Sequence, residues 1–309
     1  MMTKSEYNYQ GPLNGAYAIQ DSFITNELKE FAMSTYEWRD FFVADGITDH
    51  SKKFLKSFKY WVRKSNNNNI SGLNQFKHTT QTNGTSEAFT MFMMRHNKRK
   101  FKFFKGDFMM HKIASNIMGV DWEWIKDTSS LSKGDAVIIS CPFSDTGDKH
   151  EHHDTLIQIC NQLEIPVLVD MAYFGMCSGI NINLDQPCIE EVTFSLGKTF
   201  PLIGARAGIR FQKEEIDDPV LFANQHGIVN NFAAMVGQFA MECAGPDYIV
   251  DKYKQAQTEV CNKLNLIPTK CILFALSDKE EDKQYNRGNN LTRLCISKLV
   301  KEEQEQRGL

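Results

Sequence analysis

The most informative part of the chain is the segment 193–210, which reads TFSLGKTFPLIGARAGIR. Within it, Lys198 stands among small and apolar residues, between Ser195 and Arg206. An ammonium group in apolar surroundings is costly to bury unless it is paired or loses its proton. Such a lysine can form a Schiff base with an aldehyde cofactor, and a hydroxyl together with a guanidinium can bind a phosphate. Taken alone, the segment fits a glycine-containing surface loop equally well, so both interpretations stay open.

The spacing of these residues resembles a known motif. Ser195-x-x-Lys198 followed by Gly204-x-Arg206-x-Gly208 is similar to the cofactor-lysine motif of the class I/II aminotransferases. These are fold-type I enzymes that use pyridoxal 5'-phosphate (PLP). The resemblance implies that Lys198 is catalytic and carries PLP as a Schiff base, while Ser195 and Arg206 bind the phosphate group. The two glycines would let the backbone approach the ligand closely.

A second phosphate-binding element is expected where a glycine turn enters a helix, at Gly84, Thr85 and Ser86. The free N–H groups and the positive end of the helix dipole favour an anion at such a turn. An ordinary helix N-cap has the same local sequence. The family has a phosphate-binding turn of this form before its lysine, so the resemblance assigns these residues to the cofactor phosphate.

Further residues match the positions that surround the cofactor ring in this family: Phe108, Ser144, Asp170 and Tyr173. Phe108 would stack on the ring. Asp170 ends a continuous apolar run, as at the carboxyl end of a buried parallel strand, and would keep the ring nitrogen protonated. Tyr173 and Ser144 would donate to the phenolic oxygen, with Ser144 standing where the family has an asparagine. Asp170 and Tyr173 thus join the lysine as expected catalytic residues.

The segment 291–297, which reads LTRLCIS, is similar to the strand that carries the family's substrate-binding arginine. The resemblance implies that Arg293 binds the α-carboxylate of an amino acid, which suits the planar fork of a guanidinium. A lone arginine on a two-sided strand could also be a surface residue whose stem covers apolar neighbours. The implied reaction moves the amino group of an α-amino acid to a 2-oxo acid, and these two small molecules are the expected partners.

The chain departs from the family pattern at several places. Phe41 stands where the family has a tyrosine that reaches the phosphate of the partner subunit's cofactor. Only twelve residues follow Ser297, so the helix that closes the small domain is expected to be shortened or absent. Two alternatives therefore stay open: other PLP chemistry, by a decarboxylase or a C–S or C–O lyase, and a degenerate PLP-binding protein with a regulatory role. Because the family is dimeric, the resemblance also implies a homodimer with the site at the subunit interface.

The composition favours no other class of partner. The chain has 35 basic and 38 acidic residues and no apolar run that approaches the roughly 20 residues of a membrane span, so we expect neither nucleic acid nor a membrane as partner. Eight cysteines without C-x-x-C spacing indicate reduced packing residues of a cytoplasmic protein. His150, His152 and His153 would point in different directions from a helix start, so we expect no metal site.

The predicted fold class is α/β, of the kind found in fold-type I PLP transferases. It consists of a mostly parallel, seven-stranded-type sheet flanked by helices, with a reduced α+β small domain. We expect a large PLP-binding domain over residues 45–246 and a small domain formed by residues 1–44 and 247–309.

Local patterns predict several helices within this fold. Apolar residues at helical spacing predict helices over 51–64, 227–245 and 247–264. Asp148 and Glu151 resemble a capping box that opens a further helix.

Overall fold

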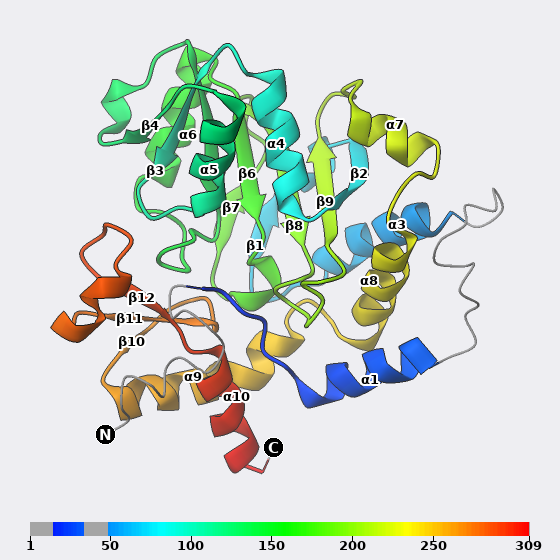
Figure 1. Cartoon of the computed structure of the whole chain (residues 1–309), viewed down its shortest axis with the longest axis vertical. Coiled ribbons are helices and arrows are strands. Elements are labelled where there is room, and N and C mark those ends of the chain that lie inside the picture. The colour runs from blue at the N-terminus through cyan, green and yellow to red at the C-terminus, as the bar shows by residue number, and fades with distance from the viewer. Residues whose placement is uncertain (1–14, 34–48, 309) are drawn as a thin grey trace.

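The computed structural model describes residues 15–33 and 49–308, so Phe41 lies outside the described residues. Its centre is a seven-stranded sheet (Figure 1). In sheet order the strands are β2 (His78–Asn83), β9 (Ala207–Gln212), β8 (Ile189–Ser195), β6 (Val167–Met171), β5 (Asp135–Ser140), β3 (Lys100–Phe104) and β4 (Trp122–Ile125). The strands from β8 to β4 run parallel, whereas β9 runs antiparallel to both of its neighbours. The predicted mostly parallel sheet of seven strands is confirmed.

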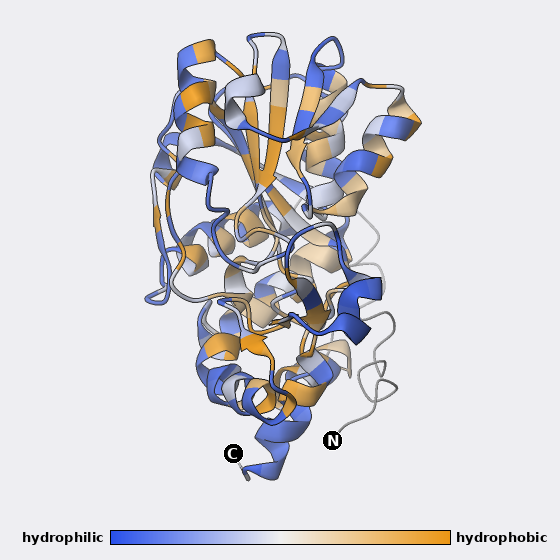
Figure 2. Ribbon diagram, turned by 90° about the vertical axis from the view of Figure 1, so that its left-hand side faces the viewer, coloured by the Kyte–Doolittle hydropathy of each residue, from blue (hydrophilic) through white to orange (hydrophobic). Residues whose placement is uncertain are grey.

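Helices cover both faces of this sheet. On one face lie α4 (Thr85–Arg95) and α5 (Met109–Met118); on the other lie α3 (His50–Val62), α6 (His153–Leu163) and α8 (Asn231–Cys243). Successive side chains of β5 point to opposite faces of the sheet. Ile138 packs on the face covered by α4 and α5, whereas Val137 and Ile139 pack on the face covered by α3, α6 and α8. A strand buried on both faces reads as a nearly continuous apolar run, and Figure 2 shows hydrophobic residues concentrated along the central strands.

A second, three-stranded antiparallel sheet lies beside the C-terminal helices. Its strands are β10 (Ile267–Pro268), β11 (Phe274–Ser277) and β12 (Thr292–Cys295); the helices are α9 (Tyr248–Leu264) and α10 (Ser297–Gln306). The N-terminal helix α1 (Ser22–Met33) packs against α8 instead. The buried Gln257 of α9 donates to the carbonyl oxygens of Cys271 (3.0 Å) and Phe274 (2.8 Å), which fixes this sheet to the helix. Helix α10 packs on α9, so a short closing helix is present.

The described N-terminal segment joins this part of the molecule through Asp21. Its buried carboxylate accepts hydrogen bonds from the Ile24 N–H (2.8 Å), Lys252 Nζ (2.6 Å) and the Tyr253 hydroxyl (2.8 Å). Burial acts to raise the pKa of Asp21, but these hydrogen bonds outweigh it and lower the pKa. Asp21 therefore anchors the segment that precedes α1 against α9.

The remaining elements are short. Strand β1 (Asn69–Ser71) pairs in parallel with β7 (Asn181–Asn183), and α7 (Pro219–Gln225) follows β9. The predicted capping box is wrong, because α6 begins at His153 and Asp148 instead forms an ion pair with Lys270 (2.7 Å). A turn precedes Asp148, in which the Gly147 N–H donates to the Phe143 carbonyl oxygen (2.8 Å). Of the helices in the described ranges, none is both long enough and apolar enough to cross a membrane.

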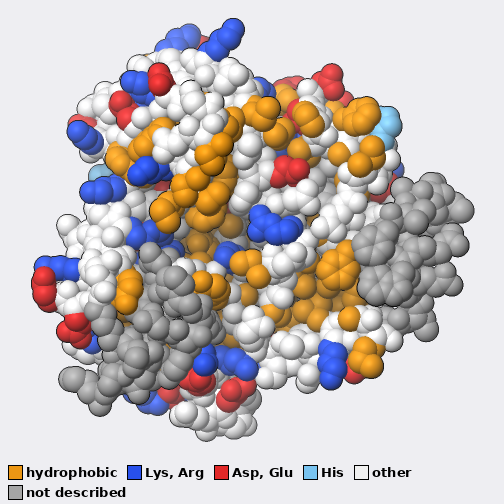
Figure 3. Space-filling view, viewed as in Figure 1, with side chains coloured by type: hydrophobic (Ala, Val, Ile, Leu, Met, Phe, Trp, Pro, Cys, Tyr) orange, Lys and Arg blue, Asp and Glu red, His pale blue; other side chains and the backbone are white. Residues whose placement is uncertain are grey.

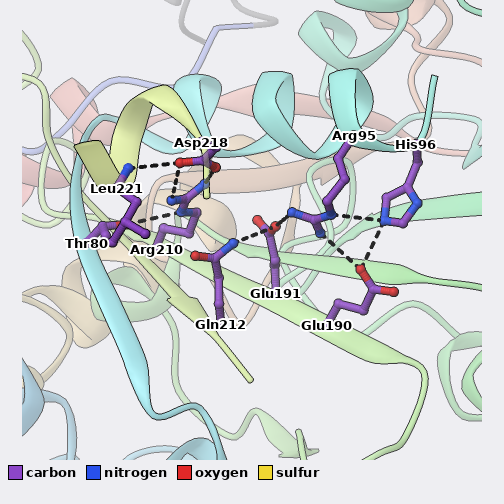
Figure 4. A network of polar contacts seen from close by, with 9 residues as sticks. All are labelled: Thr80, Arg95, His96, Glu190, Glu191, Arg210, Gln212, Asp218 and Leu221. Carbon is purple, nitrogen blue, oxygen red and sulfur yellow. Dashed lines mark hydrogen bonds and ion pairs between the residues drawn. The ribbon is translucent and has the colours of Figure 1, made fainter. Parts of the chain in front are cut away.

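A buried polar network lies at the amino-terminal end of β8 (Figure 4). The fully buried Arg210 pairs with Asp218 (Nη2–Oδ1, 3.1 Å) and donates to the Thr80 hydroxyl (3.1 Å). On the neighbouring strand, the buried Glu191 pairs with Arg95 of α4. The network ties the start of β2, the end of β9 and the start of α7 to the centre of the sheet. It stabilises the end of the sheet opposite to the site described next.

Candidate active site

The carboxyl ends of β5, β6 and β8 meet at one edge of the sheet. Their pairing places Ser140 beside Asp170 and Asp170 beside Thr193. Ligands bind at this edge in open α/β sheets. The loops beyond it enclose a cavity of about 190 Å³, which all the predicted cofactor-binding residues except Ser144 line. The lining residues are Gly84, Thr85, Ser86, Phe108, Ser140, Asp170, Ala172, Tyr173, Ser195, Gly197, Lys198, Ile203 and Arg206.

One end of the cavity is built to bind an anion. Helix α4 begins there, directly after Gly84, and its first N–H groups carry the positive end of the helix dipole. Arg206 reaches across to the same turn, where its Nη2 donates to the Asn83 carbonyl (3.1 Å). The backbone of Arg206 has a φ of +62°, a conformation that is costly for a residue other than glycine and is often found at functional sites. Ser195 adds a hydroxyl to this end of the cavity.

Lys198 stands on the loop that follows β8 and faces the cavity. Its Nζ donates to the carbonyl oxygen of Ala16 (2.6 Å), in the segment anchored by Asp21. Burial lowers the pKa of Lys198, and the positive charges of Arg293 and Arg206 act in the same direction. A lowered pKa leaves a larger fraction of the amine neutral, and the neutral amine is the nucleophile that attacks an aldehyde.

Asp170 projects from the end of β6 and is only 2% exposed. One carboxylate oxygen accepts a hydrogen bond from the Ala172 N–H (3.0 Å), and the other lies 3.7 Å from Nε2 of His111. The His111 ring is held against Phe89 (4.7 Å between ring centroids) and Phe103 (5.8 Å). Asp170 is therefore held by a backbone hydrogen bond on one side and lies beside an imidazole on the other.

Two aromatic side chains complete the cavity wall. Phe108 precedes α5 and meets Phe89 edge to face, with ring centroids 6.3 Å apart. Tyr173 packs edge to face on Phe274 (5.3 Å), and burial raises the pKa of its phenol, so the hydroxyl keeps its proton and can donate.

Arg293 lies in β12 and is 2% exposed, so the alternative of a surface arginine is wrong. Its Nη1 donates to the carbonyl oxygen of Ser144 (2.6 Å), and its Nη2 donates to that of Gly15 (2.9 Å). The guanidinium also lies over the Phe274 ring, 4.2 Å from the centroid. Arg293 and Ser144 thus form a layer next to the cavity wall; contact of Ser144 with a cofactor stays a prediction.

Sequence reasoning did not assign a role to two side chains of this region. His111 stands three residues after Phe108, the N-cap residue of α5, and this spacing was the available signal that both side chains lie at the start of one helix. Arg287 stands in a polar loop without a recognisable pattern, so the sequence gives no signal for it; its Nη1 donates to the Ser144 hydroxyl oxygen (3.2 Å).

Comparison with known proteins agrees with this geometry. Residues 106–271 match the model of the family described as aminotransferase class I and II. Solved structures of similar fold include the PLP-bound C–S lyase of Staphylococcus hominis, with a TM-score of 0.64 and 12% identity over 99% of this chain and 95% of that one. Tyrosine aminotransferase of Leishmania infantum gives 0.62 and 15% over 99% and 98% of the two chains. Aspartate aminotransferase of Thermotoga maritima gives 0.62 and 13% over 96% and 92%. None of the curated proteins matches the chain.

Proposed function

Because its residues 106–271 match the family model over more than half of its length, this chain belongs to the class I and II aminotransferases, a PLP-dependent family, and we propose that it is an active aminotransferase. It would move the amino group of an α-amino acid to a 2-oxo acid. One observation carries the proposal. A single cavity holds Lys198 between an anion-binding end, formed by the start of α4 and Arg206, and the buried carboxylate of Asp170.

The cavity fits PLP in the order of its chemical groups. Gly84, Thr85 and Ser86 at the start of α4, together with Ser195 and Arg206, would hold the phosphate. Asp170 would face the ring nitrogen at the other end, held by the Ala172 N–H. Phe108 would stack on the ring, and Tyr173 would donate to its phenolic oxygen.

Proton transfer is assigned to Lys198. PLP, when bound, supplies an electron sink for the bond that breaks at Cα, and it works best with a protonated ring nitrogen. The carboxylate of Asp170 would stabilise that proton. Lys198 would take the proton from Cα of the amino acid through Nζ, a role that its lowered pKa supports.

Arg293 would bind the α-carboxylate of the substrate. A guanidinium offers a rigid pair of parallel N–H donors to a carboxylate. The contacts of Arg293 with the Ser144 carbonyl and the Phe274 ring hold this group beside Tyr173. The substrate Cα would then lie within reach of Lys198.

We expect a homodimer with the site near the subunit interface. Large hydrophobic side chains are exposed near the cavity, where Met109 and Met110 directly follow the cavity-lining Phe108. Ile203 itself lines the cavity while 49% of its surface is exposed. Figure 3 shows hydrophobic side chains gathered on this face of the molecule. A patch of this kind commonly marks an interface, and sedimentation analysis of the purified protein tests it.

The domain division proposed for the chain follows the packing of its two ends. Residues 45–246 would form the large PLP-binding domain, and residues 1–44 with 247–309 the small one. The hydrogen bonds of Asp21 to α9 and the packing of α10 on α9 support the grouping of both ends.

A cytoplasmic location is proposed from the cysteines. All eight are free thiols, and every one except Cys243 is buried. Thiols that persist as packing residues suit a reducing compartment.

The test is the visible absorbance of the purified protein with PLP, recorded before and after adding a panel of α-amino acids. An aminotransferase converts each consumed amino acid into one 2-oxo acid and needs a second 2-oxo acid as acceptor for further turnover. Release of carbon dioxide instead would identify a decarboxylase, and release of a thiol from a sulfur-containing amino acid a C–S lyase. Bound PLP without any turnover would identify a degenerate, regulatory member of the family.

A further inference from the structure

Cys177 and Cys271 are two buried cysteines that lie opposite each other as an isolated antiparallel bridge. On one side of the pair, the Ile272 N–H donates to the Met176 carbonyl oxygen (2.9 Å). On the other side, a hydrogen bond of 3.2 Å joins the residue after Cys177 to the residue before Cys271. Because the flanking residues make these bonds, the two cysteines form a non-hydrogen-bonded pair. In such a pair the opposing Cα atoms come closest, at about 4.5 Å.

This arrangement suits a disulfide bond. A disulfide requires Cα atoms roughly 4.4–6.8 Å apart and Cβ atoms that point toward each other's side. Directly opposed residues of an antiparallel pair meet this requirement, because their side chains lie on the same face of the ribbon. The two thiols also influence each other: burial, and after it the neighbouring Cys271 thiol, raise the pKa of Cys177. Both cysteines are free thiols in this structure, so it describes the reduced form of the pair.

The pair lies directly beneath the surface of the molecule. Cys177 and Cys271 are themselves only 1% and 0% exposed. The adjacent Lys270, however, keeps 43% of its side chain exposed, and Gly179 is exposed as well. The bridge is isolated, and a short pairing of this kind opens more easily than a strand inside a sheet. Opening of its outer end alone would bring a small reagent to the thiols.

A bond between these cysteines would join two parts of the candidate site. Cys177 directly follows the 3-10 helix η4 (Phe174–Met176), the turn that comes after Tyr173. Cys271 leads into β11, which pairs with β12, the strand that carries Arg293. The bond would therefore tie the turn beside the cofactor-binding tyrosine to the sheet that carries the arginine.

We propose that Cys177 and Cys271 are a redox-modification site, at which a low-molecular-weight disulfide converts the two thiols into a cross-strand disulfide. One cysteine attacks the reagent as its thiolate, forms a mixed disulfide and releases the first reagent thiol. The second cysteine attacks this mixed disulfide, forms the bond between Cys177 and Cys271 and releases the second reagent thiol. The two cysteines lose two electrons and two protons, which the two released thiols carry away. In a reducing compartment the bond is transient and is reversed by thiols. The inference does not depend on which reaction the enzyme catalyses.

The test treats the PLP-loaded protein with bis(2-hydroxyethyl) disulfide, a small neutral disulfide, and analyses a non-reduced digest by mass spectrometry. The peptides that contain Cys177 and Cys271 should appear joined, and dithiothreitol should separate them. Cys243 is the one cysteine that is not buried, so it should carry a reagent adduct and show that the reagent was active. The inference is overturned if Cys177 and Cys271 stay free, carry separate adducts or join other cysteines while Cys243 is fully modified.

Thermal unfolding gives a second measurement. The bond closes a chain loop of roughly 100 residues, so oxidation should raise the Tm by roughly 5–10 °C. Cys271→Ala should abolish both the joined peptides and this shift. Cys261→Ala is the matched control, because it removes another fully buried thiol, from α9, and should keep both. An equal Tm shift in Cys271→Ala overturns the inference, and the peptide map of the wild type decides the question if that variant does not fold.

Discussion

Gly208 of β9 lies so close to Gly84 that a Cβ atom on Gly208 would stand 2.5 Å from the Cα atom of Gly84. The obstructing atoms belong to the backbone and cannot turn aside as a side chain could. Gly84 itself has a φ of +77°, and a Cβ atom there would lie 2.6 Å from Nη2 of Arg206. Two glycines thus bring the start of α4 and the arginine together at the phosphate end of the cavity.

Gly208→Ala should therefore damage both stability and cofactor binding. The new methyl group has to push β9 away from β2 at the turn, which should cost about 1–3 kcal/mol of unfolding free energy and weaken PLP binding. Urea unfolding and a PLP titration measure the two effects. Gly204→Ala is the control, because a Cβ atom at Gly204 meets no described atom within 4 Å. If Gly208→Ala and Gly204→Ala have the same unfolding free energy and the same PLP affinity, the close approach of Gly208 to Gly84 is not required for either property.

Lys198 should be the residue that PLP modifies. Reduction of the yellow holoprotein with borohydride should attach the cofactor permanently to the peptide that contains Lys198, and mass spectrometry of the digest locates it. Lys198→Arg keeps a positive charge but cannot form the imine, so it should lose the visible absorbance and all turnover. Label on another lysine would contradict the assignment.

Asp170→Asn should separate binding from catalysis. The amide is nearly the same size and can still accept the hydrogen bond from the Ala172 N–H, so much of the PLP affinity should remain. The ring nitrogen would lose the carboxylate that keeps it protonated, and kcat should fall by roughly 100- to 1000-fold, as when one electrostatic stabiliser is removed. PLP content and kcat are measured on the same preparation. A normal kcat would show that Asp170 has only a structural role.

The parallel sheet and its functional edge could be predicted because their signals are local. The run that ends at Asp170 is apolar without alternation, which a strand buried on both faces requires, and its acidic end marks the carboxyl edge. The order of the motifs then placed Lys198 and Arg206 at the same edge. Such predictions need no knowledge of which distant residues touch.

The parts that escaped prediction depend on contacts between distant segments. Gly204 and Gly208 look equivalent in the sequence, but only the pairing of β9 with β2 places the second against Gly84. His111 comes within 3.7 Å of Asp170 only because α5 folds over the sheet. Arg287 gains its position from a loop that crosses to Ser144, and loops of that kind have no periodic signal.

The ion pair between Arg210 and Asp218 should stabilise the fold above acidic pH. Burial alone would raise the pKa of Asp218, but the hydrogen bonds and charge of Arg210 and the N–H of Leu221 outweigh it and lower the pKa. The folded value thus lies below the unfolded value of about 3.9. The stabilisation is fully present above that value and is lost as the pH falls through the folded pKa.

Asp218→Asn should then cost about 3–5 kcal/mol of unfolding free energy at neutral pH, because the fully buried Arg210 loses its counter-charge. The difference from the wild type should shrink when urea unfolding is repeated near pH 3. The neighbouring Asp217 is exposed, so Asp217→Asn is the control and should change little at either pH. If the difference in unfolding free energy between Asp218→Asn and the wild type stays constant with pH, the charge of Asp218 does not stabilise the fold.

Arg293 offers the sharpest test of the substrate class. Its burial and its contacts with Ser144 and Gly15 exclude the surface interpretation, and we expect its guanidinium to bind the α-carboxylate of the substrate. If it does, Arg293→Ala should lower kcat/KM for an α-amino acid by about 30- to 1000-fold, equivalent to about 2–4 kcal/mol for an enclosed charge-assisted pair. The same variant should have little further effect on the amine that results from decarboxylation of that amino acid, since this amine lacks the group in question. Arg293→Lys should recover only part of the loss, because it restores the charge but not the planar fork.

The decisive quantity is the ratio of kcat/KM for the amino acid to that for the amine, measured in wild type and in Arg293→Ala. A ratio that is the same in both proteins would show that Arg293 does not read the α-carboxylate, and the role of the Arg293–Ser144 layer would then be structural.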